Sequence, residues 1–141
     1  MRLVTFKRNS KISLGALTDD LQKVVGLQQV YQRAQNSTHA ALESMQALIE
    51  SGSEGLAVAA SALAAATADE QQPLGSVSLL APLPVPPQIR DCLCFEDHVV
   101  NAMQMASKQT GEPPAQRHVD MLETMRKQPI WYKANRFAVV G

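Results

Sequence analysis

Asp91 and His98 have the residue types and spacing that could do chemistry, because carboxylates bind hard metal ions and imidazole exchanges protons near neutral pH. They lie seven residues apart, directly after the proline-rich stretch Ala81–Pro87. Proline lacks a backbone N–H and biases the residue before it toward extended conformations, so we expect a loop to deliver Asp91. Two structural alternatives stand beside this chemistry: Asp91 as a turn or helix cap, and His98 as a core histidine bonded to a carbonyl.

Helical periodicity surrounds and follows His98. We expect one helix from about Phe95 to Thr110, ended by Gly111 and Pro113-Pro114, and a second over Gln116–Lys127. The first would bury an apolar face made of Phe95, His98, Val99, Ala102, Met105 and Ala106.

The amino-terminal half predicts a small sheet followed by helices. Strands are expected at Leu3–Lys7 and Lys11–Leu17, joined by a turn at Asn9-Ser10, with further strands at Val24-Val25 and Val77–Leu80. A first helix begins near Gln28. The next carries the stripe Leu42, Met45, Leu48 and Ile49 and ends at Gly52, where a positive φ is favoured. Ser53 would cap the following helix, whose buried stripe would be Leu56, Ala60 and Leu63.

Charge and cysteine usage exclude several classes of protein. Thirteen basic and thirteen acidic residues give a formal net charge of zero, which argues against nucleic-acid binding. Cys92 and Cys94 are too few for a structural zinc site and badly spaced for a disulfide with each other, so we expect two small core thiols in a reducing compartment. The N-terminus lacks a signal-peptide pattern, and the weakly polar stretch Leu56–Ala68 is too short to span a bilayer. We therefore expect a soluble cytoplasmic protein that does not bind membranes.

The segment around Asp91 resembles the fumarylacetoacetate hydrolase superfamily, whose members carry D-F-Y-x-x-x-x-H. A bacterial form of this motif, RDFYAFEQHV, matches at Arg90, Asp91, Phe95, Glu96, His98 and Val99. The stretch 132–141 is similar to the family's YYKGNRFSVVG, and the stretches 1–6 and 14–17 are similar to the amino-terminal domain of that subgroup. The resemblance spans essentially the whole chain.

The resemblance implies a hydrolase that cleaves carbon–carbon bonds of diketo or acylpyruvate-type acids with a divalent metal, magnesium, manganese or calcium. Its metal-ligand aspartate corresponds to Asp91 and its general-base histidine to His98. A substrate-contacting tyrosine corresponds to Tyr132, with strand packing beside Trp131 as the alternative. Lys108 lies near a substrate-binding arginine of some members, with a solvated helix lysine as the alternative.

This chain departs from the family pattern at informative positions. Leu93 replaces the second aromatic of D-F-Y, and Asn101 stands where some members place a glutamate that holds the histidine. The family's E-x-E pair and later aspartate have no counterpart before Gly141, so the metal site is incomplete in this chain, and 137–140 is expected to form a strand. We therefore expect a truncated form with little activity alone, which forms a homodimer or pairs with a missing carboxy-terminal portion.

The expected fold class is α+β. Residues 1–81 would form a small amino-terminal domain of β-hairpin and helices, and residues 82–141 would supply the linker, the motif helix and the first strand of an incomplete, β-rich catalytic domain. The alternative function is a non-catalytic α/β module for folding or partner binding.

Overall fold

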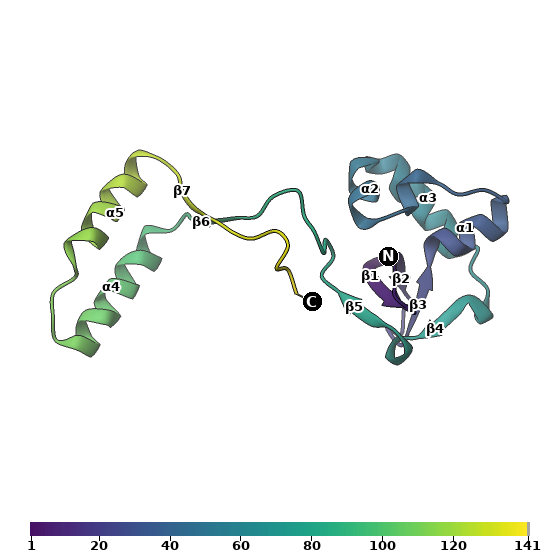
Figure 1. The fold of residues 1–141 in the computed structure, drawn as a ribbon, viewed down its shortest axis with the longest axis horizontal. Helices are drawn as coiled ribbons and strands as arrows, with labels where there is room; N and C mark the ends of the chain where they lie inside the picture. The colour runs from purple at the N-terminus through teal and green to yellow at the C-terminus, as the bar shows by residue number, and fades with distance from the viewer. Residues whose placement is uncertain (141) are drawn as a thin grey trace. The chain divides into compact units, whose positions relative to one another are not determined.

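The computed structural model describes residues 1–140 and has a mixed α+β fold, as the sequence predicts (Figure 1). The chain divides into two compact units. The first comprises Met1–Pro86 together with the last few residues from Phe137, and the second comprises Pro87–Arg136.

A five-stranded antiparallel sheet forms the base of the first unit, in the order β4-β3-β2-β1-β5 (Figure 1). Its strands are β1 (Arg2–Arg8), β2 (Lys11–Leu17), β3 (Lys23–Gly26), β4 (Gln71–Pro73) and β5 (Ser78–Leu80). The predicted hairpin is confirmed: Asn9 and Ser10 take φ values of 46° and 65° in a two-residue turn, where asparagine tolerates the left-handed region. The turn residues therefore set the register of β1 against β2.

Three helices lie between β3 and β4 in this unit: α1 (Leu27–Gln35), α2 (Met45–Glu50) and α3 (Gly52–Ala64). Short 3-10 turns occupy Ala40–Leu42, Ala68–Glu70 and Leu74–Ser76. The prediction of a single helix that carries both Leu42 and Ile49 is wrong. Leu42 lies in a 3-10 turn, and α2 begins after Ser44, whose hydroxyl caps it by accepting a hydrogen bond from the Ala47 amide at 3.1 Å. Gly52 does take a positive φ of 58°, but it is the first residue of α3, so Ser53 lies inside the helix and is not its cap.

The core lies between one face of the sheet and these helices. Leu14 and Ala16 of β2 pack in one buried cluster with Leu27, Leu42, Leu48, Ala59 and Ala62. The buried stripe of α3 is Gly55, Ala59 and Ala62, so the predicted stripe is wrong at two positions: Leu56 is 47% exposed and Ala60 is exposed. The third, Leu63, is partly buried and packs against the core cluster. The small residues on the inner face of α3 let the helix backbone approach its neighbours closely.

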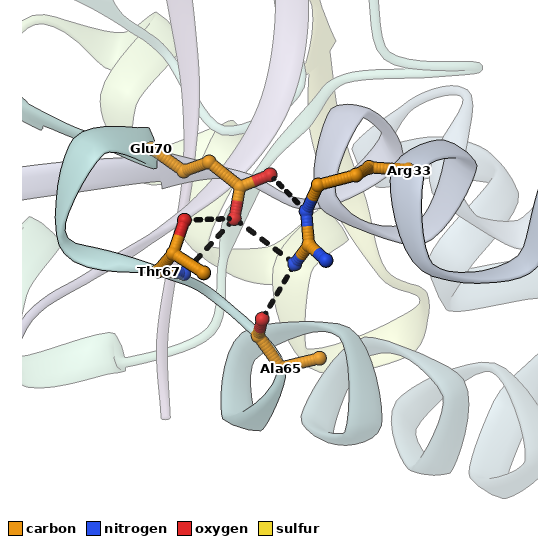
Figure 2. Close-up of polar contacts among 4 residues, drawn as sticks. All are labelled: Arg33, Ala65, Thr67 and Glu70. Carbon is orange, nitrogen blue, oxygen red and sulfur yellow. Dashed lines mark hydrogen bonds and ion pairs between the residues drawn. The ribbon is translucent and has the colours of Figure 1, made fainter.

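Arg33 of α1 ties this helix to the segment that follows α3 (Figure 2). Its Nε and Nη2 donate to the two oxygens of Glu70 at 2.8 and 3.1 Å, and Nη2 also donates to the Ala65 carbonyl at 2.7 Å. Glu70 additionally accepts from the Thr67 amide and hydroxyl, both at 2.9 Å. The hydrogen bonds from Arg33, followed by the one from the Thr67 amide, lower the pKa of Glu70 to about 2.

The second unit contains β6 (Arg90–Leu93), α4 (Glu96–Thr110), α5 (Gln116–Lys127) and β7 (Ile130–Lys133) (Figure 1). Both helix predictions are confirmed, and Gly111 ends α4 with a φ of 73°. The strand predicted at 137–140 is wrong, since these residues have no regular secondary structure and the strand lies earlier, at β7. Among the described side chains of this unit only Val99 is buried, so the unit has almost no core of its own.

Candidate functional site

The structure brings two of the predicted site residues together. Strands β6 and β7 pair antiparallel, and Asp91 lies directly opposite Tyr132 in their register. Directly paired side chains point to the same face, with Cβ atoms about 5 Å apart. Both side chains are exposed, so a carboxylate and a phenol hydroxyl stand side by side on an open surface.

A loop leads to Asp91, as expected, because residues 81–89 have no regular secondary structure, but Asp91 itself lies on strand β6. The proline-rich stretch does end before it, but residues 90–93 become extended by pairing with residues 130–133. This partner is far away in the sequence, and so the local pattern did not indicate a strand at Asp91.

His98 is the third residue of α4, and its side chain is exposed. Its amide donates to the carbonyl of Phe95, the residue that precedes the helix, at 3.2 Å. The apolar face predicted for this helix is wrong: Phe95 is 77% exposed, Met105 is 62% exposed, and only Val99 is buried at 5%. The core-histidine alternative therefore fails, and His98 presents its imidazole to solvent.

Lys108 does not join His98. It lies ten residues further along α4, about 15 Å at the helical rise per residue. It occupies the last turn, where a cation interacts favourably with the helix dipole. The geometry thus favours the helix-lysine alternative over a substrate contact. His98 and Asp91 are also not joined directly, since no hydrogen bond or ion pair links them in the described part of the chain.

The opposite face of the β6–β7 ribbon carries a different set of side chains. Cys92 is paired with Trp131 in the register, and the Arg90 guanidinium lies 5.2 Å from the centre of the Trp131 ring. This distance is typical of a cation–π contact. Cys92 and Cys94 are both free and exposed, so the expectation of core thiols is wrong, because no buried layer covers this ribbon among the described residues of its unit.

An ion pair that sequence reasoning missed joins the start of α4 to the end of α5. The Arg126 guanidinium donates to both oxygens of Glu96, one of them from Nε at 3.1 Å. The hydrogen bond from Arg126 lowers the pKa of Glu96, and the same contact raises the pKa of Arg126. The two residues are thirty positions apart and belong to different helices, so no local pattern pairs them.

The donors present do not fit a complete divalent-metal site. Hard cations such as magnesium take six or more oxygen ligands, usually including several carboxylates. Within residues 1–140, no three or more histidine, cysteine, aspartate or glutamate side chains gather closely enough to hold an ion. Asp91 offers one carboxylate, with Tyr132 as its polar neighbour across the strands.

The fold and these residues define a mixed α+β protein with an exposed polar ribbon in its second unit. Comparison with protein-family models found no match, and neither did comparison with curated proteins. No helix in the described part of the chain is long and apolar enough to cross a membrane.

Proposed function

We propose that this chain is part of a hydrolase of the fumarylacetoacetate hydrolase type that cleaves a carbon–carbon bond in diketo or acylpyruvate-type acids. Asp91 is the metal-ligand position, His98 the general-base position and Tyr132 a substrate contact. The observation that supports this most is the cross-strand pair of Asp91 and Tyr132, because two motifs forty-one residues apart meet on one face of the ribbon.

The exposure of these groups supports a role for them in binding. A carboxylate and a phenol hydroxyl on an open strand face are accessible to a ligand, and neither group belongs to a buried cluster. An exposed imidazole can take a proton from water near neutral pH, and help of this kind is typically worth about a hundred- to ten-thousand-fold in rate. The ligands for a metal at this position amount to a single carboxylate in the described part of the chain.

The chain alone is proposed to have little activity. A divalent cation in the resembled enzymes would need further carboxylates, which another polypeptide segment would have to bring to Asp91. The second unit buries only Val99, and such a surface gains stability when another layer of protein covers it.

An absorbance assay tests the proposal on the intact chain. Acylpyruvates are incubated with the protein and added magnesium or manganese, beside a His98→Ala variant. His98 is exposed, so the variant keeps the fold. We expect turnover indistinguishable from that of the variant. Metal-dependent turnover that disappears in His98→Ala would overturn the claim of low activity while supporting the assigned role of His98.

A non-catalytic partner-binding module is the second candidate. It is favoured by the aromatic side chains that the second unit leaves exposed: Phe95, Trp131 and Tyr132. Aromatic residues are enriched in protein interfaces. Calorimetric titration with magnesium separates the two candidates, since micromolar binding that is lost in Asp91→Ala would exclude the non-catalytic module.

A further inference from the structure

The β1–β2 turn places two cations directly opposite each other. Arg8 ends β1, Lys11 begins β2, and the two form the last pair in the register of the hairpin. Like charges directly opposite across strands destabilise a sheet. Neither residue forms an ion pair with a carboxylate in the described part of the chain. This end of the hairpin therefore carries concentrated positive charge in a protein whose net charge is zero.

A pocket of about 290 Å³ opens beside these cations. Arg8 and Lys11 line it together with the polar residues Asn9, Ser13, Gln29 and Gln72 and with Phe6. No carboxylate lines it. The pocket thus combines two positive charges with several neutral hydrogen-bonding groups, a combination that suits an anion with several oxygens.

Gln72 adds an independent observation. Its side-chain oxygen is buried and has no hydrogen-bond partner, although buried polar atoms in folded proteins are nearly always paired. The amide could rotate and present its NH2 group to an anion in the pocket, and it would lose no hydrogen bond from this oxygen in doing so.

We propose that this hairpin pocket binds a small oxyanion of the phosphate type, either free or as the phosphate group of a small molecule. Phosphate suits the pocket better than a carboxylate does, because it carries up to two negative charges opposite two cations and has more acceptor oxygens. The pocket belongs to the first unit and involves neither Asp91 nor His98, so this inference is independent of the proposed hydrolase function.

Titration of the intact, isotope-labelled chain with sodium phosphate tests the proposal, with ¹H–¹⁵N correlation spectra as the readout and ionic strength held constant with sodium chloride. We expect saturable shifts in the millimolar range at residues 8–13 and at Gln72. Arg8→Gln should weaken binding by about tenfold, the value of one charge-assisted hydrogen bond. Arg8→Lys, which keeps the charge, should retain most of the affinity.

Lys7→Gln is the matched control, because Lys7 precedes Arg8 on the same strand and points to the opposite face. It removes the same charge and should leave the affinity within about twofold. If Lys7→Gln and Arg8→Gln weakened phosphate binding equally, the proposed site would be refuted, because the binding would then come from non-specific electrostatic attraction. Absence of saturable shifts would refute the site as well. Sodium acetate should bind at least about tenfold more weakly, and equal affinity for acetate would overturn the assignment to phosphate.

Discussion

Replacing Glu70 by glutamine should destabilise the first unit through the contacts that surround its carboxylate. The Glu70 carboxylate is the acceptor in all four of these hydrogen bonds, two of them donated by Arg33 and two by Thr67. The glutamine amide has one oxygen and one NH2 group, so at least one donor would face another donor. Charged hydrogen bonds are worth about 1.5–3 kcal/mol each, and surface ion pairs about 0–1 kcal/mol. With the Glu70 side chain 18% exposed and that of Arg33 48% exposed, we expect a net loss of about 1.5 kcal/mol.

Thermal unfolding followed by circular dichroism measures this loss, with hydrogen exchange assigning it to the first unit. A loss of about 1.5 kcal/mol in a unit of this size corresponds to a Tm lower by about 6–12 °C. Asp69→Asn is the matched control: it removes the same charge at the neighbouring position, and the Asp69 side chain makes none of the hydrogen bonds described here. Equal Tm losses in the two variants would refute the reasoning, because the effect would then come from charge alone.

The same contacts set a pH dependence. Because the pKa of Glu70 is lowered from its ordinary 4.5 to about 2, its ionised form is favoured in the folded chain. The stabilisation is therefore fully present above pH 4.5 and is lost as the pH falls toward 2. The Tm difference between the wild type and Glu70→Gln should shrink over that window. A constant difference would contradict the lowered pKa as its cause.

Three further predictions follow from other contacts. Gly15→Ala should destabilise the first unit by about 1–3 kcal/mol in a urea titration, because a Cβ there would lie 2.7 Å from the Phe6 ring and 2.8 Å from a β3 carbonyl oxygen. Gly75→Ala is the control and should be neutral, because a Cβ at Gly75 meets no atom within 4 Å. Glu96→Gln should speed amide exchange in α4 and α5 by removing the ion pair to Arg126. This contribution is present above pH 4.5 and is lost as the pH falls, and equal exchange rates would show that the ion pair contributes nothing. Amides of the second unit should exchange faster than those of β1 and β2, since the second unit buries only one side chain, and equal protection would contradict that account.

Much of the first unit could be predicted from local chemistry. Asn9-Ser10 indicated the hairpin and Gly52 indicated a positive φ, because these features depend on a few adjacent residues. The burial of α3 could not be predicted in this way. The rule that large apolar residues face inward selected Leu56, but close packing between α3 and its neighbours gave the inner face to Gly55, Ala59 and Ala62.

The candidate site was predicted only in part, because its geometry depends on pairing between distant segments. The types and spacing of Asp91 and His98 singled them out, but not the strand that carries Asp91 or the position of Tyr132 opposite it. The expected burial of Cys92 also failed, since exposure depends on what covers the ribbon and not on the residue type. The roles of these residues in a reaction remain predictions.

Paramagnetic broadening by manganese tests the proposal that Asp91 is a metal-ligand position with Tyr132 beside it. Low concentrations of Mn²⁺ are added to the labelled chain and amide signals are followed by NMR, beside Asp91→Asn and the control Asp97→Asn, which removes an exposed carboxylate from the first turn of α4. We expect the strongest broadening at Asp91 and at Tyr132, which lies opposite it in the register, and we expect this broadening to be lost in Asp91→Asn and retained in Asp97→Asn. Broadening that is unchanged in Asp91→Asn, or equally strong at unrelated carboxylates, would contradict the proposal.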